Sequence, residues 1–189
     1  MFVEGFITPE DLAKITEQLK TVRINAALIG LEEPKDEESF LRMQKETHAL
    51  RKSNISFLHG EEWNWLYEKL SGAVNYANVN NYSKVLYGIS PLQYSEYDSK
   101  YNGFYGPHTD NVNNIKTGLQ RSLSFSLQLT DGDTYEGGDV KIYYNDVMCI
   151  ANRTAGVLTF FDSNTFHEVT PVTSGFRKSL VGWVLGPRV

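Results

Sequence analysis

Apolar residues recur at helical spacing in the first part of the chain. Leu12, Ile15 and Leu19 form one stripe. Thr8-Pro9 before them is a typical helix start, because threonine caps free backbone amides and proline fits the first turn. A wider apolar stripe over 61–77 predicts a second helix that packs against a sheet. Neither stripe carries an obvious reactive group, so both helices are expected to be structural.

The pattern then changes from helical to extended. Residues 32–38 are acidic and contain a proline, which indicates an exposed loop, and a short helix over 40–43 and a strand over 51–58 are expected to follow. From residue 82, short apolar or alternating runs are separated by Gly, Asn and Asp, as is typical of strands. The predicted strands are 84–89, 92–97, 121–129, 140–144, 147–150, 157–161, 166–169 and 178–185.

Two predicted strands have faces of different character. Side chains two apart in a strand point the same way, so the leucines of 121–129 share one face with Phe125, and small polar residues share the other. A solvated face more often carries Lys and Glu than serine, so this polar face predicts a cavity wall, with an outer surface as the alternative. The polar set is Ser122, Ser124, Ser126 and Gln128. One face of the last strand carries Arg177, Ser179, Val181 and Trp183.

The order of these elements argues against a βαβ arrangement, because helices come first and strands later. Several short strands with turn residues between them predict a sandwich or a jelly-roll barrel. Of these we expect the second, a mainly β fold with flanking helices: a double-stranded β-helix (jelly-roll, cupin-like) core with N-terminal helices packed on one sheet. The 189 residues suit a single domain, 1–189, with a helical flank and the first strands over 1–81 and the jelly-roll core over 82–189.

Composition narrows the function classes. Hydrophobic residues make up 41% and charged residues 22% of the chain, which argues against disorder. A net charge of −5 disfavours binding to nucleic acid. The single cysteine, Cys149, allows no intrachain disulfide, which favours a cytoplasmic location, and its apolar neighbours predict a small core residue. No signal peptide and no run of about 20 apolar residues is visible, so no membrane association is expected.

The candidate chemistry centres on His108 and Asp110. In extended backbone these two side chains point to the same side, and His167 on a later strand offers a third ligand. Two histidines and one carboxylate leave one face of a metal open, as in non-haem iron(II) sites. A His-x-Asp pair alone is a weak pattern, but Arg177 follows ten residues after His167. A buried arginine is costly unless a carboxylate ligand meets its guanidinium.

These residues resemble the iron(II)- and 2-oxoglutarate-dependent dioxygenases, within them the prolyl 4-hydroxylase-like group. His108, Asp110 and His167 match the iron ligands of that family, and Arg177 matches the residue that binds the far carboxylate of 2-oxoglutarate. Further similarity lies in the motifs Leu-Gln-Tyr-Ser-Glu-Tyr (92–97), Tyr-Glu-Gly-Gly-Asp-Val (135–140), His-Glu-Val-Thr-Pro-Val (167–172) and Arg-Lys-Ser (177–179). The resemblance covers roughly residues 82 to 187.

The resemblance implies further roles. Ser179 and Tyr97 match partners of the cosubstrate, while Gln128 stands where some prolyl hydroxylases have a tyrosine that contacts it. Arg121 matches a substrate contact near the cavity mouth, with a surface arginine as the alternative, and Trp183 matches a pocket residue. Tyr105 is a third candidate for contact with the substrate. Iron(II), 2-oxoglutarate and O2 are the implied cofactors and cosubstrates, with ascorbate as an additional reductant.

The implied reaction is hydroxylation of an unactivated C–H bond, with 2-oxoglutarate and O2 converted to succinate and CO2. A prolyl residue in a peptide or protein is the favoured substrate. A different amino acid, a small molecule or a nucleobase stays open as the substrate, and a non-catalytic jelly-roll metal-binding module stays open as the function.

The loop 98–107, which includes Tyr105, is expected to act as a lid or to be an irregular connection. His48 and His59 are expected at the surface. The sequence leaves the oligomeric state open.

Overall fold

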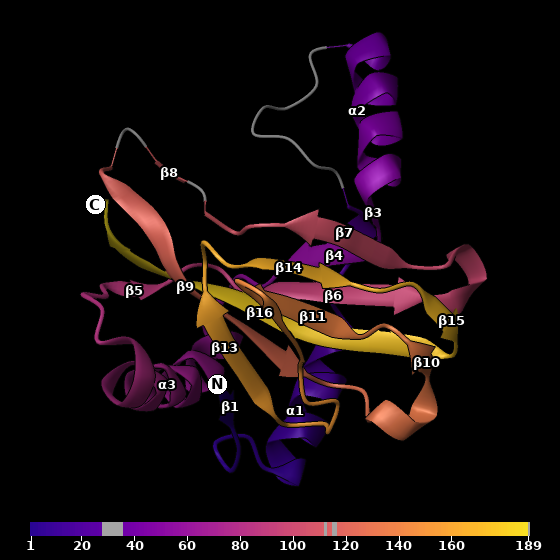
Figure 1. Ribbon diagram of the computed structural model, residues 1–189. Helices are drawn as coiled ribbons and strands as arrows, with labels where there is room; N and C mark the ends of the chain where they lie inside the picture. The colour runs from indigo at the N-terminus through magenta and orange to yellow at the C-terminus, as the bar shows by residue number, and fades with distance from the viewer. Residues whose placement is uncertain (28–35, 112, 115–116, 189) are drawn as a thin grey trace.

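Two antiparallel sheets form the core of this computed structural model, which describes residues 1–27, 36–111, 113–114 and 117–188 (Figure 1). The major sheet has nine strands, and its main path runs β1-β13-β9-β16-β6-β4-β2, with β5 pairing β16 and β8 pairing β9. The minor sheet has five strands in the order β12-β11-β14-β7-β3, and β10 and β15 form a separate pair. This arrangement confirms the predicted mainly β, jelly-roll fold.

The strands of the major sheet are β1 (Phe2–Val3), β2 (Asn25–Ala26), β4 (Asn54–Phe57), β5 (Gly88–Ile89), β6 (Gln93–Asp98), β8 (Asn113–Asn114), β9 (Leu119–Gln128), β13 (Leu158–Asp162) and β16 (Phe176–Pro187). Those of the minor sheet are β3 (Arg51–Lys52), β7 (Phe104–His108), β11 (Val140–Tyr144), β12 (Val147–Ile150) and β14 (Phe166–Val169). The small pair is β10 (Glu136–Gly137) with β15 (Val172–Ser174).

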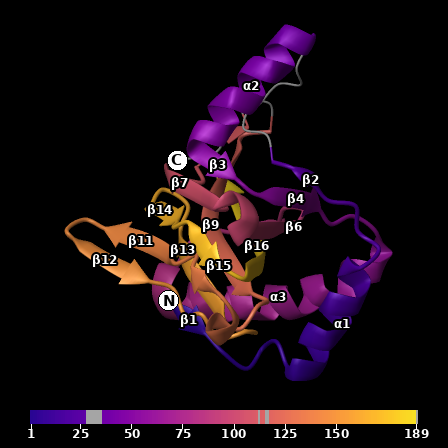
Figure 2. The same ribbon diagram turned by 90° about the vertical axis from the view of Figure 1, so that its right-hand side faces the viewer.

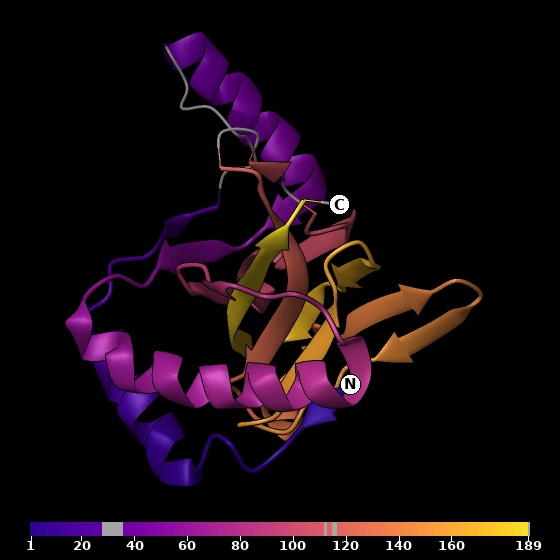
Figure 3. The ribbon, with the colours of Figure 1, turned by 90° about the vertical axis from the view of Figure 1, so that its left-hand side faces the viewer.

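Helices α1 (Pro9–Leu19) and α3 (Asn64–Ala77) cover the outer face of the major sheet (Figure 3). Thr8 caps α1 by accepting a hydrogen bond from the Asp11 amide, as the Thr-Pro start predicts. The apolar stripes of both helices join the strands in one core, which confirms that the helices pack on one sheet. Its fully buried helix and strand members include Ile15, Leu66, Leu70, Ala73, Leu123, Phe125, Leu158 and Leu180.

The third helix, α2 (Glu37–Leu50), projects away from the two sheets (Figure 2). Its 14 residues extend well beyond the short helix predicted over 40–43. Phe40 and Leu41 are exposed on it. Of the acidic loop predicted over 32–38, residues 32–35 lie outside the described residues. None of the helices in the described ranges is long and apolar enough to cross a bilayer.

Several predicted strands need correction. The run 51–58 is not one strand: β3 and β4 are separated at Ser53 and belong to different sheets. Only Gly88–Ile89 of the predicted strand 84–89 is extended in a sheet. Cys149 was expected in the core but is exposed, because all four residues of β12 are exposed in a hairpin at the edge of the minor sheet. His48 and His59 are exposed, as predicted.

Gly182 of β16 packs closely against Phe125, which lies opposite it on the neighbouring strand β9. A β-carbon at Gly182 would lie 2.1 Å from Cζ of the fully buried Phe125 ring. We expect Gly182→Ala to lower the free energy of unfolding by about 1–3 kcal/mol, because the ring has to move within a filled core. Urea denaturation of both proteins measures this difference.

The matched control is Gly88→Ala on β5, where a β-carbon would meet no atom within 4 Å. Its free energy of unfolding should stay within about 0.5 kcal/mol of the wild type. Equal losses in the two variants would contradict this account of the packing.

Candidate active site

A cavity of about 340 Å³ lies between the two sheets, and residues from both sheets line it. The major sheet supplies Phe57, Gln93, Tyr97, Arg121, Ser126, Phe161, Arg177, Ser179, Val181 and Trp183. The minor sheet supplies Arg51, Tyr105, His108, Val140, His167 and Val169, and Thr109 and Asp110 follow β7. The polar face predicted for β9 is buried, and Ser126 lines the cavity. The face of β16 predicted from Arg177 to Trp183 lines it throughout.

His108, Asp110 and His167 come together on one side of this cavity. His108 of β7 lies directly opposite His167 of β14 in the minor sheet, although 58 residues separate them in the sequence printed above. Asp110 Oδ1 is 3.6 Å from His108 Nε2, and Asp110 Oδ2 is 3.5 Å from His167 Nε2. One ligand atom from each residue lies within 4.8 Å of the others, close enough to hold a single metal ion.

Backbone carbonyls orient both imidazoles. His108 Nδ1 lies 2.8 Å from the Gly106 carbonyl oxygen, and His167 Nδ1 lies 3.0 Å from that of Thr165. With Nδ1–H donated to a carbonyl, each Nε2 presents its lone pair to the space between the rings and Asp110. Burial, and then the neighbouring His167, lower the pKa of His108 to about 4, so this imidazole is neutral near pH 7. Neutral imidazoles are the form that binds metals.

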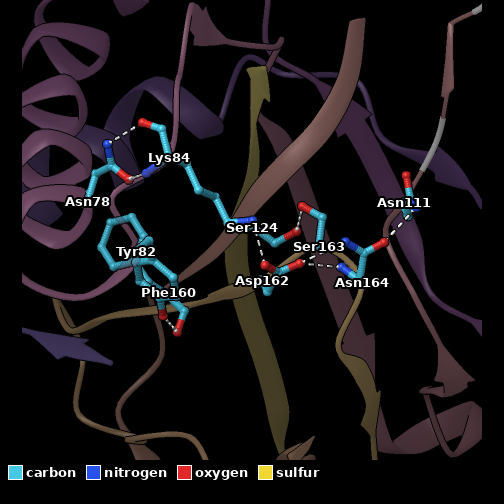
Figure 4. A network of polar contacts seen from close by, with 9 residues as sticks. All are labelled: Asn78, Tyr82, Lys84, Asn111, Ser124, Phe160, Asp162, Ser163 and Asn164. Carbon is cyan, nitrogen blue, oxygen red and sulfur yellow. Dashed lines mark hydrogen bonds and ion pairs between the residues drawn. The ribbon is translucent and has the colours of Figure 1, made fainter. Parts of the chain in front are cut away.

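The turn between β13 and β14 holds the backbone at Asp110. Figure 4 shows Ser163 and Asn164 of this turn beside Ser124 and Asn111. The Asp110 backbone amide donates to the Ser163 carbonyl at 2.9 Å, and the Ser163 hydroxyl lies 2.8 Å from that of Ser124 on β9. Next to it, Asn111 Nδ2 donates to Asn164 Oδ1 at 2.6 Å. These contacts position Asp110, and none of them involves its carboxylate oxygens, which stay available to a ligand.

One oxygen of the Asp110 carboxylate lacks a hydrogen-bond donor among the described residues. This atom, Oδ2, is buried. A buried carboxylate oxygen without a donor is unfavourable unless a cation arrives. Two imidazoles and one such carboxylate fit a divalent ion with open coordination positions, and iron(II) is the metal typical of this donor set.

Arg177 supplies a positive charge deeper in the same cavity. Its side chain is 2% exposed, Nη1 donates to Ser179 Oγ at 3.2 Å, and the guanidinium lies 5.4 Å from the Tyr97 ring centroid. No carboxylate of the described chain lies within 4.0 Å of it. A β-carbon at Gly138 would lie 2.9 Å from Val172 Cγ2 and 3.1 Å from Arg177 Cδ, and one at Gly137 would lie 2.0 Å from the Pro171 carbonyl oxygen. The Gly-Gly motif therefore fits a place where the chain packs too closely for side chains, and at Gly138 one of the close neighbours is the Arg177 stem.

The remaining predicted site residues divide into two groups. Arg121 and Trp183 both line the cavity, with the Arg121 guanidinium 3.6 Å from the Trp183 ring centroid, and Tyr105 stacks on His108 at 3.6 Å between ring centroids. Gln128 does not line it: its amide nitrogen donates to the Thr130 carbonyl and the Tyr135 hydroxyl. The placement of Gln128 therefore does not support its predicted contact with a cosubstrate.

The last part of the predicted lid belongs to the minor sheet. Residues 104–107 belong to β7, which pairs with β14 and β3, and a short 3-10 turn, Ser99–Tyr101, precedes it. The sequence reasoning also missed Arg51, Phe57 and Gln93 as cavity residues. Gln93 and Phe57 lie in predicted strands, so the alternation of side chains along these strands was a signal that could have assigned them to a face toward the cavity.

Comparison with known proteins agrees with this geometry. Residues 92–185 match the family model of the 2OG-Fe(II) oxygenase superfamily. The chain belongs to this superfamily. The match includes all four of His108, Asp110, His167 and Arg177. Membership implies iron(II), 2-oxoglutarate and O2 for the family's chemistry.

A relative and two solved structures illustrate the similarity. A PKHD-type hydroxylase of Maricaulis maris (strain MCS10) is 38% identical over 80 residues, 42% of this chain and 36% of that protein. A Pseudomonas putida prolyl-4-hydroxylase shares the fold with a TM-score of 0.68 at 20% identity, over 100% of this chain and 92% of that one. A Trichoplax adhaerens prolyl hydroxylase, solved with a hypoxia inducible factor peptide fragment, gives 0.72 at 15% identity, over 97% and 82%. The match thus spans well under half of the curated relative's length.

Proposed function

We propose that this protein is an iron(II)- and 2-oxoglutarate-dependent oxygenase that hydroxylates an unactivated C–H bond. The observation that carries the proposal is one cavity lined by two kinds of unsatisfied groups. His108, Asp110 and His167 form an open metal site, and Arg177 is a buried cation with no carboxylate within 4.0 Å among the residues that the structure describes. A closed structural zinc site, the non-catalytic alternative, needs neither an open coordination face nor a carboxylate receptor beside it.

Each residue has a definite task in this proposal. His108 and His167 would hold iron through Nε2, because their Nδ1 atoms face backbone carbonyls, and Asp110 would complete the set. When bound, iron and 2-oxoglutarate supply oxidation of a C–H bond by O2, coupled to conversion of 2-oxoglutarate to succinate and CO2. Arg177, assisted by Ser179, would bind the far carboxylate of 2-oxoglutarate through its planar guanidinium.

Apolar side chains complete the cavity around these polar groups. Val140, Phe161, Val169 and Val181 all line it. An apolar wall limits bulk water near the metal site, which strengthens the charge interactions of Asp110 and Arg177 with their ligands.

For the substrate we propose a prolyl residue in a peptide or protein. The similarity to prolyl hydroxylases, one of them solved with a peptide, supports this choice. The cavity lining includes Phe57 and Trp183, whose ring centroids lie 6.5 Å apart, and such aromatic surfaces suit the apolar face of a pyrrolidine ring. Ascorbate as an additional reductant stays a prediction.

The test is incubation of iron-loaded protein with 2-oxoglutarate, O2 and a library of proline-containing peptides. We expect peptides that gain one oxygen atom on proline in step with succinate formation, as mass spectrometry would show. Succinate formed while prolines stay unmodified and another residue gains oxygen would remove the prolyl assignment and keep the oxygenase. The matched control is the same library with each proline replaced by alanine.

A further inference from the structure

Arg51 lies in the cavity although it comes from the N-terminal part of the chain, outside the matched family region. It is the first residue of β3, directly after α2, and pairs with Tyr105 of β7 in the minor sheet (Figure 1). At Ser53 the chain leaves this sheet, and β4 joins the major sheet. This crossing brings Arg51 to the cavity wall, where it is only 6% exposed.

The Arg51 guanidinium is held in place but not satisfied. Its Nε donates to Ser53 Oγ at 2.6 Å, and its central carbon lies 4.5 Å from the Tyr105 ring centroid. The Tyr105 ring in turn stacks on His108, so Arg51 is separated from a predicted metal ligand by a single aromatic ring. Nη2 is buried and has no acceptor in the described residues. A ring face offers attraction but no acceptor for these hydrogens, and a buried donor without an acceptor is costly.

The charged residues that line the cavity also favour an anionic ligand. Arg51, Arg121 and Arg177 line the cavity, against the single carboxylate of Asp110. None of the three arginines has a carboxylate within 4.0 Å in the described part of the chain. Iron(II) and the 2-oxoglutarate dianion cancel each other in charge, so their binding leaves an excess of two positive charges. Arg177 is engaged with the cosubstrate in the proposed function, which leaves Arg51 and Arg121 for another anion.

We propose that Arg51 binds a carboxylate group of the substrate, so that the enzyme acts on an anionic molecule. This inference rests on the proposed function and specifies its substrate class. A carboxylate is the complementary group because its two oxygens match two N–H donors of a guanidinium. The carboxylate belongs either to a chain end or to an Asp or Glu side chain near the oxidised residue.

The test compares carboxylates with uncharged isosteres in binding. Protein loaded with iron(II) and 2-oxoglutarate without oxygen, and metal-free protein in parallel, is titrated calorimetrically with short proline-containing peptides. Each peptide is made as C-terminal acid and C-terminal amide, and a second series exchanges Asp for Asn and Glu for Gln. The two series distinguish a chain-end from a side-chain carboxylate. The variants are Arg51→Gln and Arg51→Lys, with the exposed neighbour Lys52→Gln as matched control.

We expect wild type and Lys52→Gln to bind the acid of at least one pair about tenfold or more tightly than its neutral isostere, since a hydrogen bond to a charged group contributes that much. Arg51→Gln should reduce this preference to within about twofold, while its affinity for 2-oxoglutarate stays unchanged, and Arg51→Lys should retain part of it. Wild type without any acid preference, including no binding of either form, would overturn the inference. So would a preference that survives Arg51→Gln, or a parallel loss of 2-oxoglutarate affinity. If the wild type fails to bind 2-oxoglutarate, the proposed function falls, and the acid preference is still decided with the metal-free protein.

Discussion

Replacing Asp110 by alanine is expected to lower the affinity for iron(II) by well over a hundredfold. Loss of a group that merely orients a metal ligand typically costs 10- to 100-fold, and Asp110 is the anionic ligand itself. Its buried Oδ2 has no hydrogen-bond partner in the described residues, so a bound cation is the partner that this carboxylate lacks. Anaerobic titration with iron(II), followed by calorimetry, measures the loss.

A second variant, Asp110→Asn, tests the stability of the protein without metal. Because Asp110 Oδ2 is buried without a hydrogen-bond partner among the described residues, metal-free Asp110→Asn should unfold at the same or a higher urea concentration than the metal-free wild type. Iron(II) should stabilise the wild type and leave Asp110→Asn unchanged. His48→Ala, an exposed histidine far along the chain from the ligands, should keep full iron affinity. A metal-free Asp110→Asn that is clearly destabilised would mean that the carboxylate is structural.

Arg177→Met is expected to weaken 2-oxoglutarate binding by about 2–5 kcal/mol, roughly 30- to several-thousand-fold, while iron affinity changes little. Methionine keeps an apolar stem beside Gly138 and removes only the buried guanidinium, which has no carboxylate partner among the described residues. Initial rates over a range of 2-oxoglutarate concentrations measure the effect.

Lys178→Met is the control for Arg177→Met. Lys178 is the next residue on β16, its side chain is 45% exposed, and it lies 3.7 Å from Glu96. Its 2-oxoglutarate requirement should match that of the wild type. If Arg177→Met loses iron and 2-oxoglutarate affinity in parallel, the guanidinium maintains the fold instead of binding the cosubstrate.

The metal site was accessible from sequence because its signals are local. His108 and Asp110 are two residues apart, and Arg177 follows only ten residues after His167. Strand periodicity likewise placed Ser126, Ser179 and Trp183 on faces that the structure turns toward the cavity. These predictions depend only on the alternation of side chains between the two faces of a strand.

The parts that sequence missed depend on long-range arrangement. Arg51 reaches the cavity because the chain changes sheets at Ser53, and nothing in the run 51–58 marks that crossing. The strand β7 contains Gly106 and Pro107, residues that local rules assign to loops, yet sheet pairing on both sides keeps it extended. Cys149 lies in an apolar run that periodicity alone cannot distinguish from a buried strand, and it is exposed at a sheet edge.

Conversion of 2-oxoglutarate to succinate by the iron-loaded protein tests the central claim most directly. We predict that the wild type forms succinate in proportion to O2 consumed, that a metal chelator stops it, and that His108→Ala forms none above background while His59→Ala matches the wild type. If the wild type holds iron(II) at this site but forms no succinate, and 2-oxoglutarate leaves the iron spectrum unchanged, the oxygenase account is contradicted.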